Sequence, residues 1–225
     1  MATSYTGVVE PGGPAQVRTA GCLTITKLAV DPKMSNNCYV LSCAKTGDQV
    51  LIDAADEAER ILELIGSAGL TTVITTHQHW DHHRALAEIV EATGAQVVAG
   101  ALDADAITEQ TGVRVDRRLE HGDTVGIGEC AIRVLAIAGH TPGSIALHIT
   151  DDEGQDHLFT GDSLFPGGVG NTFGSAEAFA QLIDEVETKI FGTLPDSTWF
   201  YPGHGGDSTL GAERGSLPEW RARGW

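Results

Sequence analysis

His77-Gln78-His79-Trp80-Asp81-His82 places four common metal ligands among six consecutive residues. An apolar run that ends in Thr75-Thr76 leads directly into this segment. Imidazole and carboxylate groups are donors that zinc and iron accept, and one loop at the end of a strand can aim several of them at one point. A catalytic zinc takes about three protein ligands and leaves a position for water, so four donors in one loop predict a site for two ions.

Three later segments each place a further donor in a glycine-flanked turn after an apolar run. They are Ala138-Gly139-His140-Thr141-Pro142-Gly143, Thr160-Gly161-Asp162-Ser163 and Tyr201-Pro202-Gly203-His204-Gly205. A single histidine on a turn is usually a solvated or packed side chain. Four donor-bearing loops at the ends of β segments instead indicate convergence, because glycine permits the backbone shapes that bring ligands together.

The hydrophobic pattern alternates strands with helices in both halves of the chain. We expect strands or β-like runs over residues 22–30, 37–44, 49–53, 71–76, 96–99, 113–137, 144–150 and 157–160. Helices are expected after Asp56, which forms a capping pattern with Glu59, over 83–93 and 102–110, and from Ser175. The last helix has the clearest apolar stripe, formed by Phe179, Leu182, Ile183, Val186 and Ile190. This order predicts an α/β fold of two helix-covered sheets, in a single domain over 1–225.

The chain is strongly acidic, since 31 acidic and 14 basic residues among 225 give a formal net charge of -17. Nucleic acid and anionic membranes are therefore not expected as partners. Residues 1–20 show no secretory signal and no stretch is long enough to span a bilayer, so we expect a cytoplasmic protein. The cysteines lack CxxC spacing and are expected to be buried thiols; they are Cys22, Cys38, Cys43 and Cys130.

The HxHxDH motif at residues 77–82, the glycine-flanked His140, the Gly161-Asp162 pair and the Gly203-His204-Gly205 turn together resemble the metallo-β-lactamase superfamily. The resemblance spans most of the chain and implies a four-layer αββα sandwich with the metal site at one edge of its two sheets. It implies that the first metal is bound by His77, His79 and His140. It implies that the second metal is bound by Asp81, His82 and His204, and that Asp162 bridges the two metals. It also implies that Asp53, at the end of an apolar strand, orients the histidine loop by hydrogen bonds.

Hydrolysis is the reaction class that this resemblance implies. Two cations roughly 3.5 to 4 Å apart can share a water, lower its pKa and hold it as hydroxide against an electrophilic carbonyl. Asp81 is expected to orient this hydroxide as well as to bind metal. The expected cofactors are two divalent metal ions, with zinc favoured over iron or manganese. The expected partner is a small-molecule thioester or similarly activated ester.

Residues 160–165 are most similar to glyoxalase II (hydroxyacylglutathione hydrolase) and its single-domain relatives, which cleave thioesters. Three features depart from that pattern. Val169-Gly170-Asn171 stands where a Cys-Gly-Arg element is usual, and His83-Arg84-Ala85 replaces a small Gly-Gly element. Only 21 residues follow His204, which leaves no room for the helical domain that carries glutathione-binding residues. The resemblance therefore implies thioester hydrolysis without fixing the thiol carrier.

Other functions on the same fold are alternatives. A lactonase would share the seven ligands, and a persulfide dioxygenase would use one iron held by two histidines and an aspartate. The persulfide dioxygenase is also expected to carry the Cys-Gly-Arg element. True β-lactamases of the best-known zinc class have a cysteine in place of Asp162. A non-catalytic metal-binding protein is disfavoured because all seven donors are present, and nucleic-acid processing is disfavoured by the acidic balance.

Several conspicuous side chains are expected to lie outside the chemistry. Surface or packing roles are expected for His83, His121, His148 and His157, and a solvated surface for Arg214, Arg221 and Arg223. Trp80 is expected to pack in the core in preference to forming a pocket wall. Substrate contact and an inert turn are equally open for the segment just after Asp162, which contains Phe165, Val169 and Asn171.

Overall fold

The computed structural model describes residues 5–224, which build two large β-sheets. The first sheet has seven strands that neighbour one another in sequence order. These are β1 (Gln16–Ala20), β2 (Leu23–Val30), β3 (Asn36–Cys43), β4 (Gln49–Ile52), β5 (Thr72–Thr75), β6 (Gln96–Gly100) and β7 (Arg117–Leu119). Neighbours are antiparallel from β1 to β4 and parallel from β4 to β7.

The second sheet has six strands in the order β15-β14-β11-β10-β9-β8. Their bounds are β8 (Thr124–Ile127), β9 (Cys130–Ala136), β10 (Ile145–Thr150), β11 (Asp156–Gly161), β14 (Trp199–Pro202) and β15 (Ser208–Thr209). Only β11 and β14 pair in parallel within this sheet. A separate hairpin joins β12 (Leu164–Phe165) to β13 (Gly168–Val169).

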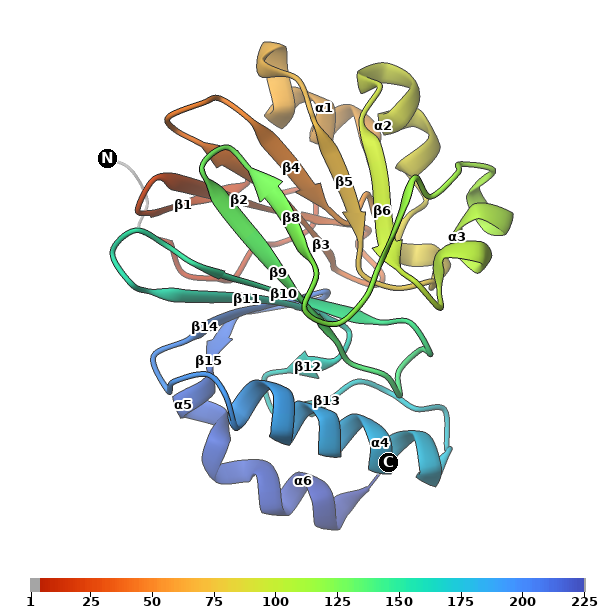
Figure 1. The fold of residues 1–225 in the computed structure, drawn as a ribbon, viewed down its shortest axis with the longest axis vertical. Helices are drawn as coiled ribbons and strands as arrows, with labels where there is room; N and C mark the ends of the chain where they lie inside the picture. The colour runs from red at the N-terminus through yellow and green to blue at the C-terminus, as the bar shows by residue number, and fades with distance from the viewer. Residues whose placement is uncertain (1–4, 225) are drawn as a thin grey trace.

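Helices cover the outer face of each sheet, as Figure 1 shows. The first sheet carries α1 (Ala58–Ile65), α2 (Leu86–Thr93) and α3 (Ala104–Thr111). The second carries α4 (Ala176–Glu185), which continues as a π-helix over Val186–Phe191, then α5 (Leu210–Glu213) and α6 (Leu217–Arg223). Short 3-10 turns occupy Gly66–Ala68, Trp80–His82 and Arg214–Ser216. The predicted αββα order of layers is confirmed.

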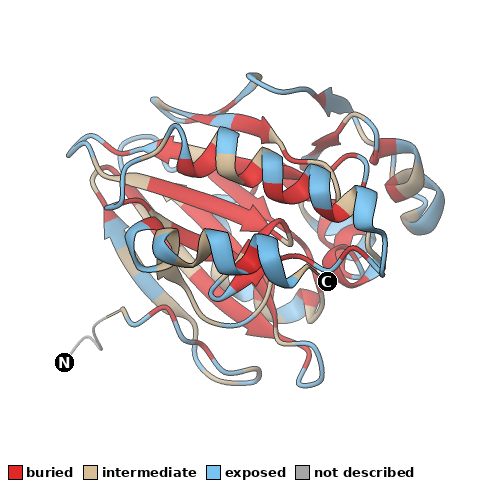
Figure 2. Ribbon diagram, turned by 90° about the horizontal axis from the view of Figure 1, so that it is seen from below, coloured by how far each residue is buried: buried red, intermediate tan, exposed pale blue. Residues whose placement is uncertain are grey.

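Three apolar layers hold these elements together. Between the sheets, the ring of Phe159 stacks on Tyr201 with centroids 4.6 Å apart, and Tyr39 meets Phe159 edge-on at 5.1 Å. Outside the first sheet, Leu51 and Ile61 belong to the layer under α1 and α2. The third layer lies under α4 and its π-helical continuation. Figure 2 shows the result, with buried residues on the sheet-facing side of the helices and exposed residues outside.

Some predicted boundaries were wrong for identifiable physical reasons. Asp56 does not cap α1, because Glu57 takes the N-cap position with a left-handed backbone (φ 53°) and no side chain accepts a capping bond. Residues 113–137 form three strands rather than one run, since β7 and β8 belong to different sheets and β8 turns tightly into β9. β1 was not predicted, because only its last residue is buried and its sequence lacks an apolar alternation. Ser175 does cap α4, its Oγ accepting from the Ala178 amide at 3.2 Å.

The carboxyl ends of strands from both sheets meet at one edge of the sandwich. Strands β4 and β5 run parallel in the first sheet, and β11 and β14 run parallel in the second. An isolated bridge between Asn36 and His204 joins the two sheets at this edge, and Asn37 N donates to Gly203 O at 2.7 Å. Loops that follow parallel strands are where ligands bind in α/β proteins.

Within residues 5–224, every helix is too short or too polar to traverse a bilayer.

Candidate metal centre

The loop that follows β5 folds back on itself so that most of its donors point inward. His82 N donates to His79 O at 3.0 Å, which closes the 3-10 turn at residues 80–82. This turn buries the side chains of Asp81 and His82, and His77 is buried at the start of the loop. Trp80 is instead 54% exposed, so the expectation that it packs in the core was wrong. The turn directs residues 81 and 82 inward and leaves residue 80 outside.

The structure brings all seven predicted donors together. His79 Nδ1 lies 2.9 Å from His140 Nε2, and His82 Nε2 lies 3.1 Å from His204 Nε2. Asp162 lies between these pairs, with its Oδ2 3.6 Å from His140 Nε2 and 3.3 Å from His204 Nε2. Three sets of donors each converge within 4.8 Å and could hold an ion: His77, His79 and His140; His77, His82 and Asp162; and Asp81, His82 and His204.

Hydrogen bonds at the back of four imidazoles fix which ring nitrogen faces the cluster. His140 Nδ1 lies 2.7 Å from the Asn171 carbonyl, and His204 Nδ1 lies 2.8 Å from the Met34 carbonyl. Both partners are acceptors only, so each Nδ1 must carry a proton and each Nε2 is the nitrogen that faces the cluster. Outer hydrogen bonds of this kind orient metal-binding histidines.

Asp53 fixes the other two imidazoles. Its Oδ2 lies 2.8 Å from His82 Nδ1 and accepts a hydrogen bond from the Thr76 hydroxyl, also at 2.8 Å. Because the Thr76 hydroxyl donates to Asp53, its oxygen accepts from His77 Nδ1 at 3.0 Å. Asp53 Oδ1 accepts a hydrogen bond from the Thr76 amide. The backbone of Asp53 has φ 57°, a conformation that aspartate tolerates better than most residues. The predicted hydrogen-bonding role of Asp53 toward the histidine loop is confirmed.

The cluster contains buried polar atoms that no protein group satisfies. His77 Nε2 and Asp162 Oδ1 are both buried without a hydrogen-bond partner. Buried polar atoms are seldom left unpaired, because the loss of hydration is costly. Both atoms belong to groups that could hold an ion, so the residues present fit a metal centre.

The electrostatics of the cluster also fit cation binding. Burial lowers the pKa of His77 well below its ordinary value and the pKa of His79 to about 4, which favours the neutral form of both rings. Burial opposes ionisation of Asp162, but the surrounding histidines, His82 foremost, hold its pKa well below the usual range. Burial likewise opposes a charge on His82, yet the carboxylates of Asp162 and Asp53 raise its pKa well above the usual range. The buried carboxylates thus attract positive charge to this point.

A cavity of about 330 Å³ opens onto the cluster. Its lining consists of Met34, His79, Trp80, Asp81, His140, Asp162, Asn171, Phe173 and His204. Asn171 therefore contacts the pocket, whereas Val169 is buried in the layer under α4. The ring centroid of Phe165 lies 6.2 Å from that of His204. Met34 and Phe173 were not anticipated, because an isolated apolar residue in a loop carries no sequence signal for a pocket.

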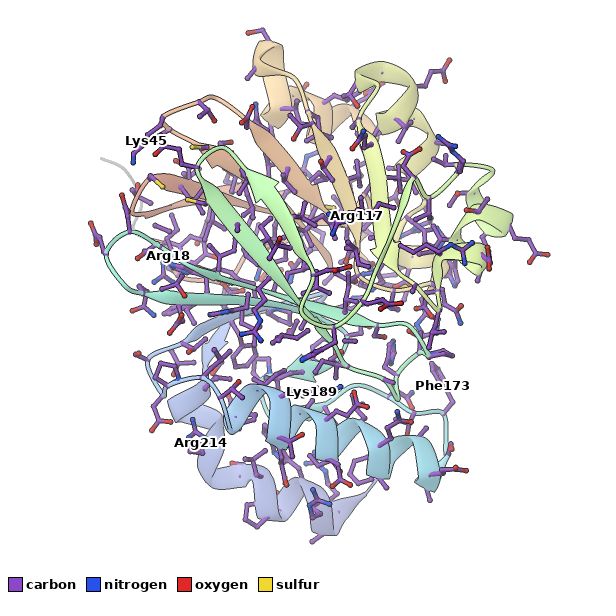
Figure 3. All side chains as sticks on the ribbon, viewed as in Figure 1. Arg18, Lys45, Arg117, Phe173, Lys189 and Arg214 are labelled. Carbon is purple, nitrogen blue, oxygen red and sulfur yellow. The ribbon has the colours of Figure 1, made fainter. Side chains whose placement is uncertain are left out.

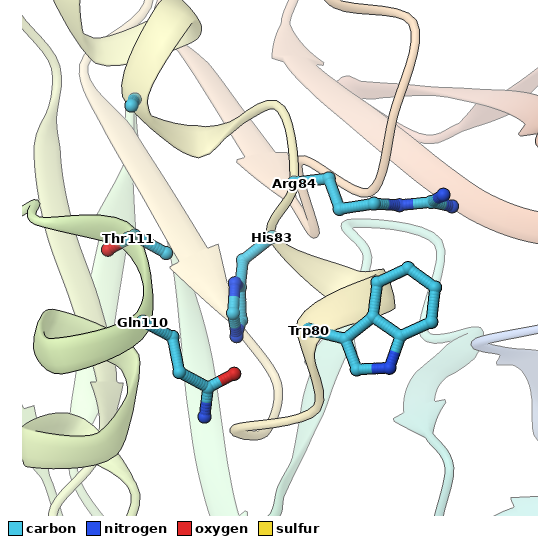
Figure 4. A pocket seen from close by; sticks show the side chains of 6 residues that line it. Trp80, His83, Arg84, Gln110 and Thr111 are labelled. Carbon is cyan, nitrogen blue, oxygen red and sulfur yellow. The ribbon is translucent and has the colours of Figure 1, made fainter.

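Trp80 separates this cavity from a second one. The second cavity, of about 290 Å³, is lined by Trp80, His83, Arg84, Ala87, Gln110 and Thr111 (Figure 4). The guanidinium of Arg84 stacks over the indole at 4.8 Å from the ring centroid. His83 contacts the loop of residues 77–82, with its Nε2 3.1 Å from Gln78 O.

The histidines predicted to lie outside the site do so. His83, His121, His148 and His157 belong to none of the three converging donor sets within the described residues. His157 is buried between Tyr201 Oη at 2.9 Å and Asp151 Oδ2 at 3.3 Å, a packing role in the second sheet. Arg221 forms ion pairs with Asp184 and Glu187 on α4 and its π-helical continuation.

An αββα sandwich with a His/Asp cluster at the shared sheet edge defines a class of metal-dependent hydrolases. The sequence matches the metallo-beta-lactamase superfamily over residues 31–210, and the chain belongs to this superfamily. The cluster could hold metal.

Named relatives point to one part of the superfamily. A hydroxyacylglutathione hydrolase of Fuscovulum blasticum is 33% identical over 220 residues, covering 90% of this chain and 80% of that protein. A hydroxyacylglutathione hydrolase-like protein of Mus musculus is 36% identical over 183 residues, covering 79% of this chain. The chain spans 61% of the length of the mouse protein and 59% of a human relative of the same name.

Two solved structures are similar to this chain in fold and in sequence. ETHE1 from Myxococcus xanthus is 31% identical with a TM-score of 0.74, covering 88% of this chain and 84% of that one. TTHA1623, solved in a di-iron-bound form, is 32% identical with a TM-score of 0.65, covering 84% of this chain and 96% of that one.

Proposed function

We propose that this chain is a dinuclear metal-dependent hydrolase of glyoxalase II type that cleaves the thioester of a small acyl group. In this proposal residues 1–225 act as one catalytic domain in the cytoplasm. The ions are divalent, with zinc favoured over iron or manganese. His77, His79 and His140 would hold the first ion, Asp81, His82 and His204 would hold the second, and Asp162 would contribute to both.

One observation carries the proposal. Four imidazoles donate hydrogen bonds from Nδ1 outward, to Asp53, Thr76, Asn171 and Met34, and so direct their Nε2 atoms toward Asp162 and Asp81. A fold kept for packing alone would have no reason to orient four rings this way around buried carboxylates. The fully formed second donor set also favours two ions over the single iron of a dioxygenase.

When bound, such an ion pair lowers the pKa of a shared water and polarises the carbonyl of the substrate. The rest of the task belongs to the residues of the chain. Asp81 Oδ2 accepts from Asn36 Nδ2 at 2.9 Å, which fixes the carboxylate beside the cluster. We assign Asp81 the role of accepting a hydrogen bond from the attacking water and aligning it with the carbonyl carbon.

The choice of a thioester rests on the relatives named hydroxyacylglutathione hydrolase and on the similarity of residues 160–165 to that group. A thiolate is also a good leaving group, so the active site needs no side chain that protonates it. None of the lining residues is a lysine, tyrosine or cysteine that would serve as such an acid. A lactonase is the second candidate, because a lactone carbonyl makes the same demand on these donors.

The test combines metal counting with a substrate panel. Purified protein loaded with zinc, iron or manganese would be measured for metal per chain and assayed on thioesters, oxygen esters, lactones, a β-lactam and glutathione persulfide. We expect two ions per chain and the highest kcat/KM on a thioester. Oxygen consumption with the persulfide as the only productive substrate, together with one iron per chain, would replace the hydrolase with a dioxygenase.

A further inference from the structure

The mouth of the metal cavity is lined by exposed apolar side chains. Six large apolar residues are exposed among residues 5–224, and three of them, Met34, Trp80 and Phe173, line this one cavity. They come from three separate segments: the turn before β3, the metal loop, and the loop before α4. Apolar groups gathered from different loops around a pocket mark a ligand-binding surface rather than scattered surface residues.

Phe173 in particular is held in an exposed position by its surroundings. Its backbone has φ 54°, a conformation rare for a bulky side chain, and its amide donates to Asn171 Oδ1 at 2.7 Å. The ring is 69% exposed, yet its centroid lies 5.6 Å from that of His79 and 5.9 Å from that of His140. Figure 3 shows it on the loop that precedes α4. Strained residues of this kind gather at ligand contacts.

The same cavity offers no cationic side chain. Its nine lining residues, all in the described part of the chain, include neither lysine nor arginine. Arg84 lines the adjoining cavity, but Asp31 Oδ2 at 2.6 Å and Asp56 Oδ2 at 3.1 Å already compensate its charge twice over. Apart from the proposed metal ions, an anionic group of the substrate would find no ion-pair partner among these lining side chains, and the formal net charge of -17 on the chain would repel it.

We infer that the substrate is an uncharged ester or thioester that carries an aryl or branched alkyl group beside the reactive carbonyl or sulfur. This inference rests on the proposed hydrolase function and narrows it. The apolar group lies between Phe173, Trp80 and Met34, and its carbonyl reaches the donor cluster. A glutathione thioester, with two carboxylates and one ammonium group, fits this mouth poorly.

The test uses the metal-loaded protein and matched substrates that differ in one part at a time. The same phenylacetyl group is placed on N-acetylcysteamine, which is uncharged, and on glutathione. We expect kcat/KM to be roughly tenfold or more higher on the uncharged carrier, because the two carriers differ in charge and electrostatic effects on association are of this size. The disadvantage of the glutathione thioester shrinks as ionic strength rises, because salt screens repulsion.

Variants test whether the rim of the cavity, formed by Met34, Trp80 and Phe173, causes this substrate preference. Phe173→Asn keeps a residue that tolerates positive φ, and Trp80→Ala removes the neighbouring wall. Each should lower kcat/KM for the phenylacetyl thioester by roughly tenfold, change the acetyl thioester much less, and leave two metals per chain. Val17→Ala, at an exposed apolar residue on β1, is the control and should change neither substrate.

The outcomes separate this inference from the function on which it rests. A higher kcat/KM on the glutathione thioester, or equal losses on phenylacetyl and acetyl substrates in both rim variants, would overturn the inference and leave the hydrolase intact. Failure to hydrolyse any ester would overturn the hydrolase. In that case calorimetric binding of S-benzyl-N-acetylcysteamine against S-benzylglutathione still decides the rim, since tighter binding of the glutathione derivative would refute it.

Discussion

Asp53 Oδ2 lies 2.8 Å from His82 Nδ1, so a carboxylate at the end of β4 holds an imidazole from the loop after β5. The parallel pairing of β4 with β5 sets this distance, because it places both strand ends at the same edge. The same oxygen accepts a hydrogen bond from the Thr76 hydroxyl, and the hydroxyl oxygen in turn accepts from His77 Nδ1 and orients that ring. One side chain therefore controls a ring in each half of the proposed metal centre.

Asp53→Asn tests this control without disturbing the backbone, because asparagine also tolerates the positive φ of this position. The amide is a weaker acceptor toward Nδ1–H than the carboxylate, so metal affinity should fall by about 10- to 100-fold. Competition with a chromogenic chelator measures the change. Asp105→Asn, at an exposed ion pair with Arg118, is the control and should leave affinity unchanged. Equal metal affinity in both variants would show that Asp53 does not support metal binding.

Asp162→Ala and His157→Ala separate a proposed ligand from a packed histidine. Asp162 belongs to a converging donor set, so its loss should reduce both metal content and turnover. The imidazole of His157 hydrogen-bonds to Tyr201 and Asp151, away from the cluster, so its loss should keep two metals per chain and lower the free energy of unfolding by about 1–3 kcal/mol. Metal analysis and urea unfolding measure the two effects. Equal metal loss in both variants would contradict the ligand assignment.

The sequence predicted the donors because their chemistry is visible in the residue types and in the glycine-flanked turns that carry them. Apolar periodicity also predicted two sheets covered by helices, because it reports which face of an element is buried, and the resemblance to the superfamily supplied the order of the four layers. It failed at Trp80, where a tight 3-10 turn rather than hydrophobicity decides which side chains face inward. It also missed Phe173 and Met34, because exposed apolar residues acquire meaning only when loops distant in sequence meet.

Asn171→Ala should change substrate preference without changing metal content. The side-chain oxygen of Asn171 holds the Phe173 amide, whereas the bond to His140 Nδ1 uses its backbone carbonyl and survives the substitution. Phe173 would lose its anchor, so the ratio of kcat/KM between phenylacetyl and acetyl thioesters should fall several-fold. A steady-state comparison of the two substrates and a metal count check this. An unchanged ratio would mean that Asn171 does not position the rim.

Lys27→Met should destabilise the protein through the loop that carries His204. Lys27 Nζ is fully buried and donates to Asp207 Oδ1 at 2.6 Å, Gly205 O at 2.7 Å and Gly7 O at 2.8 Å. Removing one partner of a buried pair leaves the other charge unpaired, which costs about 3–5 kcal/mol in the free energy of unfolding. Lys45→Met, at an exposed pair with Glu129, should have no measurable effect. Urea unfolding that gave the same result for both would show that Lys27 does not support this loop.

Removing the metal should lower stability as well as activity, because the cluster concentrates buried donors that only a cation satisfies together. His77 Nε2 and Asp162 Oδ1 are buried without a hydrogen-bond partner among the described residues, so folding without metal leaves both hydrogen-bonding positions unfilled. An ion that binds only the folded chain at about 100 times its Kd adds roughly 2.7 kcal/mol to the free energy of unfolding. Dialysis against a chelator should therefore lower Tm and abolish hydrolysis, and zinc should restore both. The metal-depleted Asp162→Ala variant is the informative comparison, since its Tm should respond little to added zinc. An unchanged wild-type Tm after verified metal removal would contradict a metal role for this cluster, whatever the assay of activity gave.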